Sequence, residues 1–241
     1  IKGTTGTQAS FLDLFEQDAG KVEALERIVA AKMGFARIEP VTGQVYTRKT
    51  DLTVMNVLAQ VAVSAHKMCN DVRILSGLGE LSEPFETEQV GSSAMPYKRN
   101  PMRCERATGL ARFVMSLASS PMMTAAEQWL ERTLDDSANR RLVLPEAFLA
   151  VDGILRILTN VAAGLNVWPE VVKARLDQEL PFMASEAILM AAVKAGGDRQ
   201  ELHERIRRHS LAAMEQVKKL GRTNDFLSRI KGDPCFAKLT N

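Results

Sequence analysis

The stretch at residues 91–101, GSSAMPYKRNP, gathers chemically useful side chains between two regions that have the spacing of helices. The backbone around Ser92 and Ser93 can turn its N–H groups toward an anion, Lys98 supplies a positive charge, and Asn100 supplies an amide that can hold a carboxylate oxygen. Such fixed donors stabilise charge that builds on a carboxylate when the neighbouring carbon loses a proton. A serine beside them could take that proton if the same donors stabilised its alkoxide. The alternative is a polar loop that caps the next helix and leaves its cations in solvent.

The elements around this stretch are predicted to be long helices. Asp51 can cap a helix through Gly77, whose apolar side chains recur with helical period and which would span about 40 Å. Further helices are expected over 102–119, 124–134 and 135–165, the last one kinked at Pro145. Helices of such length are typical of a bundle of antiparallel rods.

The spacing changes near residues 166–169, after which the expected helices are shorter. They cover 169–179, 182–194 and 198–220, and Asp198 and Glu201 have the spacing of a capping box. Aromatic residues make up only 5% of the chain, which favours helix over sheet. We therefore expect an all-α fold with a long-helix domain over 1–165 and a smaller helical domain over 166–241.

Composition argues against several classes of protein. The formal net charge of +2 gives no overall field toward nucleic acid or a membrane surface, and no window approaches the roughly 18 apolar residues of a membrane span. The three cysteines form no CxxC pair, which favours a reducing compartment and a cytoplasmic location. His66, His203 and His209 lack metal-ligand spacing, so they are not expected to bind a metal.

The segment 91–101 closely resembles the GSSxMPxKxNP signature of the fumarase/aspartase superfamily. The flanks TGQVYTRK at 42–49, PMRCER at 101–106 and ERTLDDSANRR at 131–141 are similar to the adenylosuccinate lyase branch of that superfamily. The resemblance implies a helical homotetramer that needs no cofactor. It also implies a β-elimination that releases fumarate from adenylosuccinate and from the succinylated aminoimidazole carboxamide ribotide.

The resemblance also implies roles for individual residues. Ser92 would act as the general base on the Cβ proton, and Lys98 and Asn100 would hold the succinyl carboxylate and the aci-carboxylate intermediate. The matching nucleotide contacts are Gln44, Arg106, Arg132, Ser137 and Arg141.

Spacing agrees with part of this assignment. Ser137 and Arg141 are four residues apart at an expected helix start, where they would share one face and suit a phosphate group. Asp135 and Asp136 are interpreted as simple caps, with Asp136 paired to Arg140 along the helix.

Two further expectations follow from the resemblance. The general acid would be a histidine in an upstream domain that this sequence does not contain, and active sites would be shared between subunits. Gln44, Ser92 and Arg132 therefore need not meet within one chain. The rival interpretations are another lyase of the superfamily, such as argininosuccinate lyase, and a helical scaffold without activity. The arginines between 132 and 141 favour a phosphorylated nucleotide over the first rival, and the intact Ser92, Lys98 and Asn100 argue against the second.

Overall fold

The computed structural model describes residues 1–86, 95, 97–129 and 134–239. The chain divides into two compact units, Ile1–Asn166 and Val167–Asn241. Regular structure in the described part is helical except for two short strands, β1 (Leu81–Ser82) and β2 (Asn166–Val167), which pair with each other. The predicted all-α class is confirmed.

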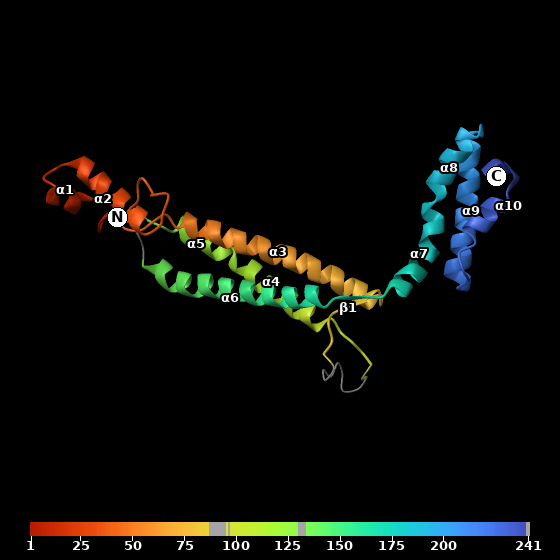
Figure 1. Ribbon diagram of the computed structural model, residues 1–241, viewed down its shortest axis with the longest axis horizontal. Coiled ribbons are helices and arrows are strands. Elements are labelled where there is room, and N and C mark those ends of the chain that lie inside the picture. The colour runs from red at the N-terminus through yellow and green to blue at the C-terminus, as the bar shows by residue number, and fades with distance from the viewer. Residues whose placement is uncertain (87–94, 96, 130–133, 240–241) are drawn as a thin grey trace. The chain divides into compact units, whose positions relative to one another are not determined.

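The first unit is built on three long helices that lie side by side: α3 (Lys49–Gly77), α4 (Met102–Leu117) and α6 (Asp135–Ala163) (Figure 1). The shorter α1 (Ala9–Leu14) and α2 (Ala19–Lys32) precede them, and α5 (Ser119–Ala126) follows α4. Alanines occupy much of the core between the long helices. Ala62, Ala111 and Ala147 are fully buried, as are the larger Met55, Val114 and Ile154. Small side chains at these positions allow the helix backbones to approach closely.

Helix α3 separates the two ends of the bundle formed with α4 and α6. It has 29 residues, which corresponds to about 43 Å along its axis. One end of α3 meets the start of α6, and the other end lies beside the start of α4. Residues held at the two ends of α3 are therefore far apart within one chain.

The prediction of a helix over 124–134 is wrong. Helix α5 begins at Ser119 and ends at Ala126, and residues 127–129 are not helical. The side chain of Gln128 instead accepts a hydrogen bond from the backbone N–H of Arg48 at 2.8 Å and donates one to the carbonyl of Tyr46 at 3.4 Å. These bonds to a distant segment hold the chain in an irregular course after α5. Helix α6, in contrast, continues without interruption through Pro145.

The second unit contains α7 (Pro169–Met183), α8 (Ser185–Lys194), α9 (Arg199–Leu220), α10 (Phe226–Gly232) and the 3₁₀ helix η1 (Pro234–Leu239). Its core includes Leu189, Leu202, Ile206, Ala213, Phe226 and Phe236. The side chain of Asp198 accepts hydrogen bonds from the N–H groups of Gln200 and Glu201 at 3.0 and 2.9 Å, which confirms Asp198 as the cap of this helix. The carboxylate of Glu201 accepts from Arg205. Helix α7 runs past the expected end at 179 and includes Pro181.

No helix in the described ranges is both long and apolar enough to cross a lipid bilayer.

Candidate active site

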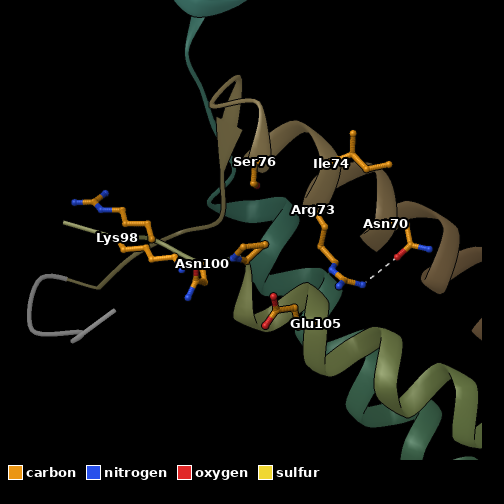
Figure 2. Close-up of a pocket in the computed structure, with 10 residues that line it drawn as sticks. Asn70, Arg73, Ile74, Ser76, Lys98, Asn100 and Glu105 are labelled. Atoms are coloured by element: carbon orange, nitrogen blue, oxygen red, sulfur yellow. Dashed lines mark hydrogen bonds between the residues drawn. The ribbon is translucent and has the colours of Figure 1, made fainter. Parts of the chain in front are cut away.

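A cavity of about 630 Å³ lies where the end of α3 meets the start of α4 (Figure 2). We call it the main cavity. Helix α3 contributes one wall, the segment before α4 contributes a second, and the first turn of α4 closes the site. The lining residues are Asn70, Arg73, Ile74, Ser76, Gly77, Lys98, Arg99, Asn100, Pro101 and Glu105.

Arg73 is fixed between the two helices that border the main cavity. Its guanidinium donates to the side-chain oxygen of Asn70 at 3.2 Å and to the hydroxyl of Thr108 on α4 at 3.5 Å. Thr108 is itself buried and donates to the carbonyl of Glu105 at 2.8 Å. Asn70 also bonds to the Nδ1 atom of His66, one turn earlier on α3, at 3.2 Å. These bonds fix a positive charge in the wall of the cavity.

The charges that line the main cavity favour an anion. Among its described lining residues, three are cations, Arg73, Lys98 and Arg99, and one, Glu105, is an acid. Asn100 adds an amide that can donate to an oxygen. The arrangement is suited to a small molecule with more than one carboxylate.

Lys98 and Asn100 both line this cavity. The backbone N–H of Lys98 donates to the carbonyl of Met95 at 2.9 Å, a turn that presents the side chains after it. Ser92 lies outside the described residues. Arg106 is exposed on α4, next to Glu105, and does not line the cavity.

A second polar cluster lies at the opposite end of α3, which we call the Arg48 cluster. It consists of Tyr46, Arg48, Asp51, Asp136 and Arg140. The Nε atom of Arg48 donates to Oδ2 of Asp136 at 2.5 Å, and both side chains are buried. Arg140 forms an ion pair with Asp51 and also donates to the hydroxyl of Tyr46, which in turn donates to Asp51 at 2.8 Å. These contacts join the start of α3 to the start of α6.

The Arg48 cluster corrects one expectation. Asp136 does not pair with Arg140 along α6: it pairs with Arg48, and Arg140 pairs with Asp51. The reason is burial, because Asp136 faces the neighbouring helix and a buried carboxylate needs a partner across that interface.

The same contacts shift the pKa values of the cluster. Burial alone would raise the pKa of Asp51, but the hydrogen bonds from Arg140 and Tyr46 and the charges of Arg140 and Arg48 outweigh it. The pKa of Asp51 is therefore lowered. Burial and the hydrogen bond to Asp51 raise the pKa of Tyr46. Asp51 is thus an anion and Tyr46 a neutral donor at neutral pH.

Three of the candidate nucleotide contacts, Gln44, Ser137 and Arg141, lie near the Arg48 cluster, whereas Arg106 lies at the start of α4, at the same end of α3 as the main cavity. Ser137 is half-buried and Arg141 exposed, both in the first two turns of α6, and Gln44 is exposed in the segment before α3. Arg132 lies outside the described residues. Asp51 and Arg73 are 22 positions apart on α3, which places the two ends about 33 Å apart along its axis. Among the described residues, Lys98 and Asn100 therefore lie far from Gln44, Ser137 and Arg141 of the same chain.

Comparison with known proteins finds lyases similar to this chain. Residues 18–116 match the family model described as "Lyase", and residues 181–241 match "Adenylosuccinate lyase C-terminus". The adenylosuccinate lyase of Schizosaccharomyces pombe is 53% identical over 239 residues, 99% of this chain and 50% of that protein. That of Saccharomyces cerevisiae is 54% identical over 236 residues, 98% of this chain and 49% of that protein. Over almost all of its length, the chain is similar to adenylosuccinate lyases.

The chain spans about half the length of these curated adenylosuccinate lyases. Solved structures agree on the fold. A 3-carboxy-cis,cis-muconate lactonizing enzyme from Pseudomonas putida gives a TM-score of 0.77 at 23% identity, over 99% of this chain and 50% of that one. A fumarate lyase from Mesorhizobium sp. BNC1 gives 0.75 at 23% identity, over 99% and 49%.

The structure adds three residues to the candidate site. Asn70, Arg73 and Glu105 line the main cavity but did not stand out in the sequence. Asn70 and Arg73 are three positions apart at the polar edge of an apolar helix, a spacing that could have drawn attention to them. Glu105 lies in the PMRCER flank without any local feature that sets it apart.

Proposed function

We propose that this chain forms part of an enzyme that eliminates fumarate from adenylosuccinate, giving AMP. By the same chemistry it would convert the succinylated aminoimidazole carboxamide ribotide into the free carboxamide ribotide. It would thus be a carbon–nitrogen lyase of purine nucleotide synthesis. The observation that carries the proposal is the main cavity, where Lys98 and Asn100 join Arg73 around a space suited to a dicarboxylate. Similarity to adenylosuccinate lyases supports the choice of substrate.

The proposed reaction begins at the succinyl group. Ser92 removes the proton on Cβ, and the electron pair spreads into the adjacent carboxylate to give an aci-carboxylate. Lys98 and Asn100 donate to its oxygens, where the negative charge is greatest, and so lower the barrier. The C–N bond then breaks, fumarate forms, and the departing nitrogen takes a proton from a general acid. By resemblance to the family, that acid is a histidine from outside these residues.

Part of the nucleotide half of the substrate is proposed to bind at the other end of α3, where Gln44, Ser137 and Arg141 lie, and Arg106 would contact it from the start of α4. Gln44, Arg106, Arg132, Ser137 and Arg141 would hold its phosphate and ribose. Because the two ends of α3 are about 33 Å apart, a complete site requires residues from more than one subunit.

We therefore propose a homotetramer. Large apolar side chains on the long helices support association, because each is more than half exposed in the isolated chain. They are Val57 and Val63 on α3 and Leu142, Phe148 and Leu149 on α6. The three cysteines are all free thiols, which fits the reducing cytoplasm as the proposed location.

The test is the ultraviolet absorbance change of adenylosuccinate. It is measured with this chain alone, and then with the chain mixed with the separately expressed upstream half of a relative. We expect turnover in the mixture, loss of turnover with Ser92→Ala, and normal turnover with the matched control Ser116→Ala. Ser116 is exposed on α4, and its hydroxyl bonds only locally to the carbonyl of Phe113.

The remaining outcomes each decide something. Turnover by the chain alone would assign the acid to these 241 residues, and His66→Gln would test the histidine bonded to Asn70. Turnover of argininosuccinate instead would show that the chain has the substrate of the rival lyase. A folded assembly with no turnover and no nucleotide binding would contradict the proposal and favour a scaffold.

A further inference from the structure

Glu83 is a buried carboxylate beside the main cavity, and the proposed chemistry does not use it. The residue is 7% exposed. Its Oε1 atom accepts the backbone N–H of Cys104 at 2.6 Å, and its Oε2 atom accepts the N–H of Arg103 at 2.9 Å. These are two of the amides at the start of α4 that lack a partner within the helix, and an anion there also interacts favourably with the helix dipole. Pro101, the N-cap of α4, makes no side-chain capping bond, so the cap comes from a residue about twenty positions earlier.

The residues after Glu83 also contact the start of α4 and the segment before it. The guanidinium of Arg103 donates to the carbonyl of Pro84 and, at 3.0 Å, to Oε1 of Glu86. The guanidinium of Arg99 stacks on the ring of Phe85, with its carbon 4.6 Å from the ring centroid. The segment 83–86 is therefore tied to the segment 99–104 by a cap, an arginine fork and a cation–π contact.

Asn100 lies within this set of contacts. A void of only about 10 Å³ separates the two segments, with Glu83, Pro84 and Phe85 on one side and Arg99, Asn100 and Pro101 on the other. Asn100 and Pro101 also line the main cavity. The carbonyl of Asn100 also accepts the backbone N–H of Met102 at 2.8 Å, so Asn100 is bonded to the first turn of α4, whose amides Glu83 caps.

We propose that Glu83 is a positioning residue for the elimination, an inference that rests on the proposed function. It fixes the first turn of α4 and, with it, the segment that carries Lys98 and Asn100. The two donors are thereby held where the aci-carboxylate oxygens form. A misplacement of about 1 Å in such donors can cost about a hundredfold in rate.

The chain contains a matched control for the capping interaction itself. Asp198 caps α9 with two backbone N–H bonds of 3.0 and 2.9 Å, the same kind of cap that Glu83 gives α4. Asp198 lies in the second unit and lines none of the cavity at the end of α3. Loss of either cap should lower thermal stability, but only loss of Glu83 should affect the reaction.

The experiment compares Glu83→Ala, Glu83→Gln and Asp198→Ala in the active mixture of this chain with its complementing half. We expect kcat to fall about a hundredfold in Glu83→Ala and about tenfold in Glu83→Gln, whose amide keeps one acceptor. Fumarate should become a weaker product inhibitor in both. Inhibition by AMP should weaken less than inhibition by fumarate, because Gln44, Ser137 and Arg141 lie at the other end of α3 and Arg106 is the one described nucleotide contact near the capped turn. Asp198→Ala should lower Tm and leave kcat and both inhibition constants unchanged.

A lower Tm with unchanged kcat and unchanged fumarate inhibition in Glu83→Ala would reduce Glu83 to a helix cap and overturn the inference. Equal loss of fumarate and AMP inhibition would do the same, since it would indicate general unfolding of the site. If Glu83→Ala does not fold, the inference is tested with Glu83→Gln and Phe85→Ala. Phe85→Ala removes the stack on Arg99 and leaves the cap, and it should also lower kcat. Absence of turnover in the unmodified mixture would instead contradict the proposed function, and the inference would fall with it.

Discussion

Cys69 on α3 and Cys104 on α4 lie in one buried cluster, and neither has any exposed surface. Burial raises the pKa of both thiols, and for Cys104 the hydrogen bond to Glu83 raises it further. A thiol that stays protonated is a poor nucleophile, so these two residues act as small apolar groups in the core. Cys235 is exposed near the C-terminus. Desolvation by the neighbouring residues raises the pKa of its thiol as well.

We therefore predict that one thiol of three reacts with a chromogenic disulfide reagent in the native chain. That thiol is Cys235, because it alone of the three is accessible to the reagent. All three should react after unfolding, and Cys235→Ser should abolish the native reaction. Reaction of two or more thiols within minutes under native conditions would contradict the burial of the pair.

Individual site residues differed in how far the sequence could reveal them. Lys98 and Asn100 could be picked out because their irregular, donor-rich segment interrupts the helical period, and the resemblance assigned them a role. Arg73 and Glu105 were not, because helical period identifies the apolar face and says nothing about which polar residue turns toward a cavity. That depends on the crossing of α3 and α4, which only the folded chain defines.

At the scale of helices, the Arg48 cluster links the start of α3 to the start of α6. Its two ion pairs join residues 88 and 89 positions apart. Local spacing suggested Asp136 with Arg140, and the failure of that prediction has a physical cause. A spacing of four identifies residues that can meet on one helix, but burial selects the partner on the neighbouring helix. Removal of one partner of a buried pair typically costs about 3–5 kcal/mol.

Asp51 gives this link a dependence on pH. Its pKa in the folded chain lies below the value of about 3.9 expected in the unfolded chain. As the pH falls, the unfolded state therefore binds the proton first. The stabilisation is complete above about pH 4 and is lost as the pH falls through the folded pKa.

We predict that Asp51→Asn lowers Tm by a constant amount between pH 7 and pH 5, and that this difference shrinks toward pH 3. Thermal unfolding followed by circular dichroism at each pH measures it. The control is Asp152→Asn, which removes an exposed pair with Arg156 and should change Tm little at any pH. A difference for Asp51→Asn that is as large at pH 3 as at pH 7 would refute the role of its charge.

For the whole molecule, the all-α class followed from helical period and from the scarcity of aromatic residues. Ends of helices were predicted well where a cap or a glycine marks them, as at Asp198 and at Gly221, which has φ of 63°. They were predicted badly after α5, where the partners of Gln128 come from the segment before α3. Contacts between distant segments carry no local pattern, and that limits what one sequence can predict.

The separation along α3 yields a prediction for the assembled protein. Lys98→Met and Arg141→Ala should each nearly abolish turnover, but co-expression of the two variants should restore about a quarter of it. The estimate assumes random mixing of subunits, with each site taking the two halves from different chains. Turnover in the complemented mixture is the measurement.

The control pairs Lys98→Met with Asn100→Ala, whose residues line the same cavity of one chain. Co-expression of these two should restore nothing, because every cavity would carry one defect. Recovery in both pairs, or in neither, would contradict a site shared between subunits.

The length of α3 thus has a consequence for inheritance. Two gene copies damaged at opposite ends of this helix would still supply working sites in the mixed protein, whereas two copies damaged at the same end would not. The severity of a substitution would then depend on which end of α3 the other copy affects, and single-variant assays would overestimate the defect in such compound carriers.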